Sequence, residues 1–367
     1  MHKHSDLIVV GASFAGLACA ISAASRGLRT VVLERKTEPG AMPHTTGLVV
    51  KEAAAEWEIP PRLTRRIGGV RLYAPSLSHV DLNSPGYFFL ATDTPEMMRW
   101  LAAKAEAAGA EIWCRRDYHG ARLQKSRITI DHLNLCGRFL VGADGPRSRV
   151  AQDFNLGRNM HFLIGVEAEF ENVRGIEGDR LHCFLDSQLA PGYIGWAIPG
   201  VNGTQVGLAC RQPYRPDLTT LIRRLSKLWD FTNSKIVARR GGLIPIGGPV
   251  GRVCSEQVLL TGDAAGLVSP LTGGGIHTAL RSGTQAGQAV ADYLLNGDPN
   301  AMTALVKSYP RFAAKRVLRS AYNLQPPNWL INLSLGNPVF RFLASNIFFH
   351  TRGLLSSKAW RDLVWVR

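Results

Sequence analysis

The sequence contains no run of about 18 or more apolar residues, which excludes an ordinary membrane-spanning helix. It also leaves no room for a secretory signal peptide, because the first expected strand begins at Leu7. Internal repeats and low-complexity tracts are absent as well. These absences favour a globular, cytoplasmic protein.

Cysteine is scarce and scattered. The six cysteines form no Cys-x-x-Cys pair, and no Cys and His residues stand at the spacing typical of a metal site. We therefore predict no metal centre and interpret the cysteines as structural thiols of a reducing compartment. They are Cys19, Cys114, Cys136, Cys183, Cys210 and Cys254.

Acidic residues are also few, since 43 Lys and Arg stand against 28 Asp and Glu, a formal net charge of +15. Much of the excess lies in residues 301–367, where ten basic residues stand against Asp362 alone. Such an excess favours an anionic membrane surface or an acidic protein as partner. No nucleic-acid motif accompanies the charge, so we do not expect nucleic acid as a partner.

What the chain does contain is a glycine-rich turn between a strand expected at residues 7–10 and a helix expected at 14–26. Gly11 permits the tight turn, Ser13 is small enough for a pyrophosphate to approach, and Gly16 lets the helix pack against the strand. Glu34 ends a second strand, where a carboxylate can accept hydrogen bonds from ribose hydroxyls. The unit predicts a dinucleotide with its pyrophosphate at the helix N-terminus.

A second glycine-rich turn follows an expected strand at residues 258–260. Asp263 lies at the end of that strand and is suited to hold the ribityl hydroxyls of a flavin. Gly273 to Gly275 then open a long helix and leave backbone N–H groups bare, which would stabilise negative charge on a reduced flavin ring. The two turns together predict bound FAD as the cofactor.

Three motifs resemble, in chain order, the FAD-binding motifs of the para-hydroxybenzoate hydroxylase-like flavoproteins. They are Gly11 to Gly16 with Glu34 and Arg35, then Gly142-Ala143-Asp144-Gly145, and then Gly262 to Gly266. Within that superfamily, residues 262–276 (GDAAGLVSPLTGGGI) are most similar to the geranylgeranyl reductase family. Residues 191–199 (PGYIGWAIP) resemble that family's aromatic substrate-cavity motif, and the likeness covers roughly residues 5–300.

The order of the elements and this resemblance imply an α/β fold with a discontinuous Rossmann-type FAD-binding domain, an inserted β-sheet substrate lobe and a C-terminal helical tail. We expect the FAD-binding domain in residues 1–75, 88–155 and 250–300, the substrate lobe in 76–87 and 156–249, and the helical region in 301–367. The residues expected to bind FAD are Gly11, Ala12, Ser13, Ala15, Gly16, Glu34, Arg35, Thr46, Gly47, Asp144, Gly262, Asp263, Pro270, Gly273, Gly274, Gly275 and Ile276.

The chain departs from the reductase pattern at several points. Tyr193 stands three rather than two positions before Trp196, and the segment ends in Ile-Pro rather than Phe-Pro. Residues 44–47 read His-Thr-Thr-Gly where the reductases often carry a cysteine, and Thr94 replaces the usual arginine. These departures leave the FAD prediction intact and weaken the prediction of a prenyl substrate.

Candidate catalytic residues flank the two loops expected to contact the flavin ring. They are His44, Lys51 and His277, each of which could instead serve a structural role. Tyr193 and Trp196 are the expected substrate residues, with simple core packing as the alternative.

The predicted function is that of an FAD-dependent oxidoreductase, which reduces C=C bonds of a hydrophobic or lipid substrate, such as an isoprenoid, by hydride transfer from flavin N5. NAD(P)H or a reduced protein is expected as a transient electron donor, because no second nucleotide-binding fold is visible. The main alternative is an FAD-dependent monooxygenase of the same fold. A flavin-dependent halogenase, a non-redox cyclase and a membrane-surface binding protein with a vestigial FAD are further alternatives.

The C-terminal region mixes aromatic and basic residues over 325–360. Such a segment can lie on an anionic bilayer, which would make the protein peripheral on the inner face of the membrane. The same aromatic residues could instead cap the substrate lobe, and the two roles are compatible if the substrate is a membrane lipid.

Overall fold

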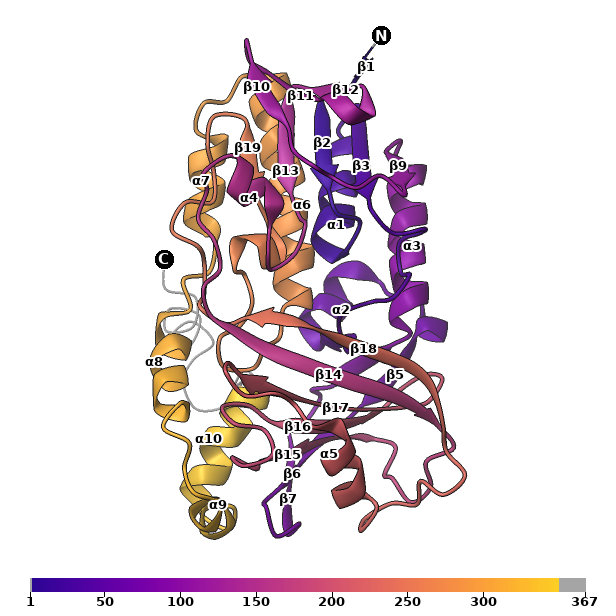
Figure 1. The fold of residues 1–367 in the computed structure, drawn as a ribbon, viewed down its shortest axis with the longest axis vertical. Helices are drawn as coiled ribbons and strands as arrows, with labels where there is room; N and C mark the ends of the chain where they lie inside the picture. Colours follow the sequence, from indigo (N-terminus) through magenta and orange to yellow (C-terminus); the bar gives the residue numbers. More distant parts are fainter. Residues whose placement is uncertain (1, 350–367) are drawn as a thin grey trace.

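A five-stranded parallel sheet in the order β19-β13-β2-β3-β9 forms the centre of the upper part of the molecule (Figure 1). We describe it from a computed structural model, which covers residues 2–349 of the chain. The strands of this parallel sheet are short and almost wholly apolar, because helices cover both of its faces. The strands are β2 (Leu7–Val10), β3 (Thr30–Glu34), β9 (Glu111–Cys114), β13 (Phe139–Gly142) and β19 (Val258–Leu260).

The helices that pack on this sheet bring distant parts of the chain together. They are α1 (Phe14–Ala24), α3 (Thr94–Ala107), α4 (Arg149–Asp153) and α6 (Ile276–Asn296). α1 and α6 touch backbone to backbone at two glycines of α6. A Cβ on Gly283 would lie 2.2 Å from the Ala15 carbonyl oxygen, and one on Gly287 would lie 2.4 Å from that of Cys19. The two glycine-rich turns are therefore held side by side by close helix packing.

A seven-stranded sheet in the order β18-β14-β17-β16-β15-β6-β7 forms the lower part (Figure 1). Neighbouring strands are antiparallel except for β15 and β6. One face packs against α5 (Leu218–Leu225) through Leu221 and Leu225. The strands are β6 (Gly69–Tyr73), β7 (His79–Asn83), β14 (Phe162–Glu171), β15 (Arg180–Phe184), β16 (Gly195–Pro199), β17 (Thr204–Arg211) and β18 (Lys235–Pro245).

Two smaller sheets contain the other strands of the described residues. One has the order β4-β8-β5 and lies next to α2 (Lys51–Trp57), and the other has the order β1-β12-β11-β10. Their strands are β4 (Leu48–Val50), β5 (Thr64–Ile67), β8 (Phe89–Thr92), β1 (Lys3–His4), β10 (Arg122–Gln124), β11 (Arg127–Ile130) and β12 (Leu135–Gly137). Short 3₁₀ turns occur at η1 (Pro61–Leu63), η2 (Asp131–Leu133) and η3 (Gly262–Ala265).

The α/β fold with an inserted sheet lobe and C-terminal helices agrees with the expectation from the sequence. The exact segment boundaries stay a prediction. β6 lies within the expected FAD-binding segment 1–75, yet it pairs with β15 and β7 of the lobe sheet, which favours moving residues 69–73 to the lobe. An apolar β-rich run predicts a strand but does not identify the sheet that accepts it.

Up to residue 349, four helices follow α6, and α8 to α10 lie along one side of the molecule beside the seven-stranded sheet (Figure 1). Two asparagines attach α9 to the lobe: the Asn328 side chain bonds Asp186 and Ser187, and Asn332 accepts from the Ser76 backbone N–H at 3.0 Å. The helices are α7 (Ala301–Ser308), α8 (Ala313–Tyr322), α9 (Asn328–Ser334) and α10 (Pro338–Phe349).

Part of the predicted basic tail, namely Arg352, Lys358, Arg361, Asp362 and Arg367, lies outside the described residues. Within residues 2–349, no helix combines the length and the apolar character needed to cross a bilayer.

Candidate functional site

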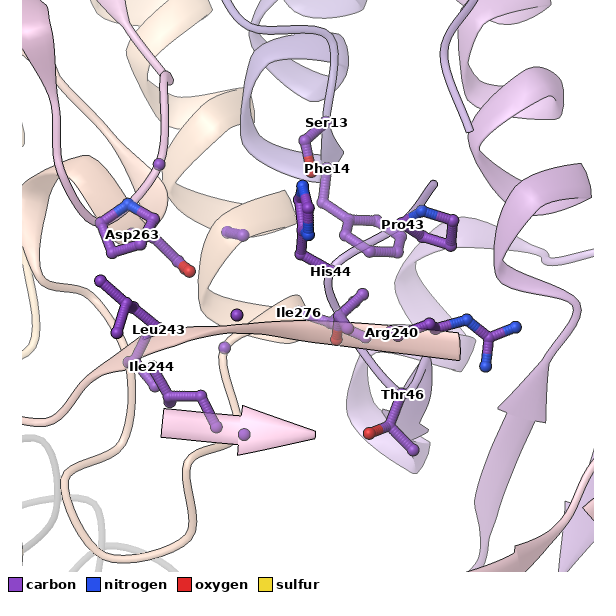
Figure 2. A pocket seen from close by; sticks show the side chains of 18 of the residues that line it. Ser13, Phe14, Pro43, His44, Thr46, Arg240, Leu243, Ile244, Asp263 and Ile276 are labelled. Atoms are coloured by element: carbon purple, nitrogen blue, oxygen red, sulfur yellow. The ribbon is translucent and has the colours of Figure 1, made fainter. Parts of the chain in front are cut away.

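A cavity of about 670 Å³ runs from the carboxyl ends of the parallel strands down to the seven-stranded sheet. Ligands of open α/β folds bind at this edge of the sheet. Figure 2 shows His44 and Asp263 reaching toward the same space from different sides, with Leu243 and Ile244 of β18 along its lower wall. The cavity therefore joins the two glycine-rich turns to the inserted lobe.

The first glycine turn can hold its shape only without side chains at two positions. Gly11 has φ +101°, and a Cβ there would lie 2.5 Å from the Ala143 carbonyl oxygen. A Cβ on Gly16 would lie 1.8 Å from the Gly11 carbonyl oxygen. α1 begins just after Ser13, which makes no side-chain capping hydrogen bond, so the first backbone N–H groups of α1 face the cavity without a cap. This end of the cavity fits a phosphate group.

The carboxylate of Glu34 is 8 % exposed and lies beside this turn in the cavity wall. It accepts hydrogen bonds from the backbone N–H groups of Ala12 and Lys36, both at 2.9 Å. A carboxylate can accept about four hydrogen bonds, so the ones already made orient it and leave acceptor capacity for ligand hydroxyls.

Asp144 contributes an incompletely bonded carboxylate to the same wall. One oxygen accepts from the backbone N–H groups of Arg149 at 2.7 Å and Val150 at 3.1 Å. The other is buried without a hydrogen-bond partner, and burial raises the pKa of this group. A buried acceptor without a partner costs free energy, which a ligand hydroxyl or N–H would recover.

Asp263 lies directly after β19, in η3, and lines the centre of the cavity. Burial raises the pKa of this carboxyl group to about 6. Nothing within residues 2–349 donates a hydrogen bond to it. The group is therefore placed to accept hydrogen bonds from a bound ligand.

The N-terminus of α6 faces Asp263 across a glycine loop. Gly275 is the N-cap residue and offers no side chain, so the first N–H groups of α6 face the cavity. A Cβ on Gly273 would lie 2.5 Å from the hydroxyl oxygen of Tyr193, which donates a hydrogen bond to the Thr272 carbonyl. The loop is thereby held against the aromatic residues of the lobe.

These features fit FAD, because helix N-termini that can bind phosphate and carboxylates that can accept hydrogen bonds from hydroxyl groups line one continuous cavity. Most of the residues predicted to bind the cofactor line the cavity. They are Gly11, Ala12, Ser13, Ala15, Glu34, Arg35, Thr46, Asp144, Asp263, Gly273, Gly274, Gly275 and Ile276. Gly16, Gly47, Gly262 and Pro270 do not line it. Gly47 and Gly262 instead make close packing contacts, with Thr94 and Ala15 respectively.

Of the three predicted catalytic candidates, only His44 lines the cavity. Lys51 donates a hydrogen bond to the Gly86 carbonyl at 2.6 Å, and His277 contacts Glu56 at 3.4 Å. Nδ1 of His44 lies 2.9 Å from the Gly241 carbonyl oxygen. Because a carbonyl only accepts, Nδ1 carries a proton there and Nε2 is left to bind or release one.

Tyr193 and Trp196 both line the cavity, as expected of substrate residues. The indole N–H of Trp196 donates to Glu167 at 2.8 Å, and Arg240 bonds the same carboxylate at 2.8 Å. Arg240 also bonds Glu169, and all three charged groups are buried.

Sequence reasoning missed this charged group at the cavity wall. Its signal was the Glu-x-Glu pattern at Glu167 and Glu169 within a strand that is mostly apolar. The partner is Arg240 on β18, which lies opposite Glu167 in the strand register and is distant in sequence. Pairing of this kind becomes visible only in the folded chain.

The lower end of the cavity is apolar. Ile347 and Phe348 of α10 complete it, so the C-terminal region does cover the lobe. The apolar residues that line this end are Leu48, Val50, Phe89, Leu181, Cys183, Tyr193, Trp196, Ile198, Leu243, Ile244, Ile347 and Phe348.

Known proteins match both the sequence and the fold. Residues 6–139 match the family model described as FAD dependent oxidoreductase. The chain is 30 % identical over 319 residues to digeranylgeranylglycerophospholipid reductase 2 of Methanopyrus kandleri, covering 81 % of this chain and 79 % of that protein. It is 27 % identical over 309 residues to geranylgeranyl diphosphate reductase of Rhodobacter capsulatus, with coverage of 80 % and 77 %.

Among solved structures, a geranylgeranyl bacteriochlorophyll reductase-like protein from Thermoplasma acidophilum superimposes with a TM-score of 0.82. The match covers 95 % of this chain and 97 % of that chain at 21 % identity. At this identity the likeness establishes the fold alone.

Proposed function

Because the chain belongs to the geranylgeranyl reductase family of FAD-dependent oxidoreductases, we propose that it reduces C=C bonds of a polyprenyl chain carried by a lipid. The observation that carries this proposal is the continuous cavity, in which an apolar end enclosed by the lobe and α10 opens onto Asp263 and the glycine loop. A long hydrocarbon can lie in that end with one double bond beside the flavin position.

When bound and reduced, FAD supplies a hydride to one alkene carbon. The other carbon requires a proton. His44 is the only one of the three catalytic candidates in the cavity, and its Nε2 is left free by the bond from Nδ1 to Gly241. We propose that Nε2 of His44 donates this proton, while the hydrogen bond from Nδ1 to the Gly241 carbonyl holds the ring in position.

Replacing His44 with alanine is expected to lower kcat for alkene reduction by about 10²-fold, because the general acid is lost. Stopped-flow reoxidation of the reduced enzyme by substrate measures this step. The His277→Ala variant is the matched control, since that ring contacts Glu56 rather than the cavity, and it should react like the wild type. Equal kcat values for the wild type and the His44 variant would contradict the assignment.

Anaerobic turnover tests the reductase against its alternatives. The enzyme, reduced chemically, should add two hydrogens per double bond to geranylgeranyl phosphate without oxygen, as seen by mass spectrometry. A requirement for oxygen with an oxygen atom in the product would identify a monooxygenase, and an isomer of unchanged mass would identify a cyclase. Screening NAD(P)H and reduced ferredoxin in the same assay identifies the electron donor.

We also propose that α8 to α10 contact the inner face of an anionic membrane. Nine large apolar side chains are exposed between residues 317 and 343, and Trp329 and Leu333 are 64 % and 71 % exposed. Residues 301–349 carry six Lys and Arg and no Asp or Glu, so their charge complements an anionic surface. The nine form the apolar patch: Val317, Leu318, Leu324, Trp329, Leu330, Leu333, Val339, Phe342 and Leu343.

The position of α10 adds support to this membrane proposal. Val339, Phe342 and Leu343 belong to the apolar patch, while Ile347 and Phe348 of the same helix line the cavity. A lipid tail could therefore pass from a bilayer along α10 into the apolar end of the cavity.

The double substitution Trp329→Ser, Leu333→Ser should lower partitioning onto phosphatidylglycerol vesicles by roughly tenfold to hundredfold, because two apolar side chains that would insert into the bilayer are lost. Cosedimentation with the vesicles measures it. Leu295→Ser, an exposed leucine at the end of α6, is the control and should bind like the wild type. Unchanged binding of the double variant would exclude the apolar patch as the contact.

A further inference from the structure

Arg319 on α8 is a buried cation without a hydrogen-bond or ion-pair partner in the described part of the chain. Its side chain is 4 % exposed, and Nε, Nη1 and Nη2 are all buried without a hydrogen bond. Burial lowers the pKa of this guanidinium. A guanidinium has five N–H donors, and desolvating them without acceptors is strongly unfavourable. Such an arrangement is expected where a ligand supplies the missing acceptors.

A second buried donor without a partner accompanies it, namely Nε of Arg211 at the end of β17. Arg211 is close enough to Arg319 to disfavour its charge. Two arginines therefore lie together here, and neither forms an ion pair within residues 2–349.

The cluster adjoins the substrate end of the cavity through Tyr193. The Arg319 guanidinium lies 6.0 Å from the ring centroid of Tyr322, whose hydroxyl donates to the Tyr193 carbonyl at 3.0 Å. Tyr193 is also close enough to Arg319 to favour the charged form of the guanidinium. Tyr193 itself lines the cavity. A molecule whose apolar part lies in the cavity could thus place a charged end group beside Arg319.

We propose that Arg319, together with Arg211, forms a site for the phosphate group of the lipid substrate. This inference rests on the proposed function for the identity of the lipid, but not for the anion itself. A phosphate offers several acceptor oxygens and negative charge, which match the planar donors of an arginine. The site would fix which end of the polyprenyl chain enters the cavity and so which double bonds reach the flavin.

Equilibrium binding to the full-length holoenzyme tests the site, with geranylgeranyl phosphate, geranylgeraniol and inorganic phosphate as probes. In Arg319→Gln, the Kd for geranylgeranyl phosphate should rise about tenfold to hundredfold, as expected for loss of charge-assisted hydrogen bonds. The Kd for geranylgeraniol, which lacks the phosphate, should stay the same. Arg223→Gln, an exposed arginine on α5, is the charge-matched control.

Inorganic phosphate separates two sources of the anion. If it raises the Tm of the wild type but not of Arg319→Gln, the site accepts free phosphate as well as the lipid group; a lipid-only response still supports the proposal. Equal affinity of the wild type and Arg319→Gln for geranylgeranyl phosphate overturns it.

The same experiments distinguish failure of the reductase proposal from failure of the anion-site proposal. If geranylgeranyl phosphate binds with the expected dependence on Arg319 but is not reduced, the anion site stands and the reductase proposal falls. If both prenyl compounds are reduced with equal KM by the wild type and Arg319→Gln, the reductase stands and the anion site falls.

Discussion

Adding one methyl group at each of Gly283 and Gly287 is expected to destabilise the cofactor-binding part of the protein strongly. In most helices, glycine to alanine stabilises by about 1 kcal/mol. Here the sign should reverse, because each Cβ would lie within 2.4 Å of a carbonyl oxygen of α1. Neither oxygen can move unless α1 and α6 separate, and overpacking of this kind costs roughly 1–3 kcal/mol per site.

The double variant Gly283→Ala, Gly287→Ala should therefore lose several kcal/mol of the roughly 5–15 kcal/mol that stabilises a folded domain. Urea unfolding and the FAD content of the purified protein measure the loss. Gly251→Ala is the control, because a Cβ there meets no atom within 4 Å. A double variant as stable as the wild type, with full FAD content, would show that the two helices are less closely coupled than the structure indicates.

Replacing Asp263 with asparagine should produce two opposite effects. FAD binding and reductase activity should fall to background, because the carboxylate at the centre of the cavity is lost. The flavin-free protein, however, should become more stable at neutral pH. In the folded chain the pKa of Asp263 is raised from 3.8 to about 6, so its charged form is disfavoured there.

The sign of the pH dependence follows from this shift. Between pH 4 and 6 the folded state binds more protons at Asp263 than the unfolded state does, so the free energy of unfolding decreases as pH rises. Above pH 6 the charged carboxylate costs roughly 1–3 kcal/mol, the lower figures applying because the group faces the cavity and water can reach it. Asparagine should remove that cost.

Thermal unfolding of the flavin-free proteins across pH 4 to 8 measures this effect. The wild type should lose stability between pH 4 and 6 relative to Asp263→Asn, and the two curves should run parallel above that range. Asp179→Asn, an exposed aspartate of the lobe, should follow the wild type. A variant that is less stable than the wild type at pH 7 would contradict the assigned burial cost.

Some of the site can be predicted from residues that are close in sequence. The turn from Gly11 to Gly16 lies within one strand-turn-helix unit, and Glu34 ends the next strand, so their proximity follows from a short β-α-β segment. Asp263 and the glycine loop are similarly local to one another. In each case the spacing and the required glycines carry the information, because the backbone geometry of the turn is local.

The catalytic candidates show where this reasoning stops. His44, Lys51 and His277 all flank the expected cofactor loops, yet only His44 lines the cavity. A side chain's direction depends on its partners, and those of Lys51 and His277 are Gly86 and Glu56. Gly86 and Glu56 lie on segments that reach these side chains only through folding.

By itself, then, the sequence determined the cofactor and the α/β class, because both depend on short segments whose geometry is set by neighbouring residues. Only the tertiary structure showed which sheet contains β6, that Arg240 bonds Glu167, and that Arg319 is buried without a hydrogen bond near Tyr193. Each of these depends on contacts between residues distant in the chain. Such contacts follow from the packing of whole helices and strands, and the local sequence pattern does not predict them.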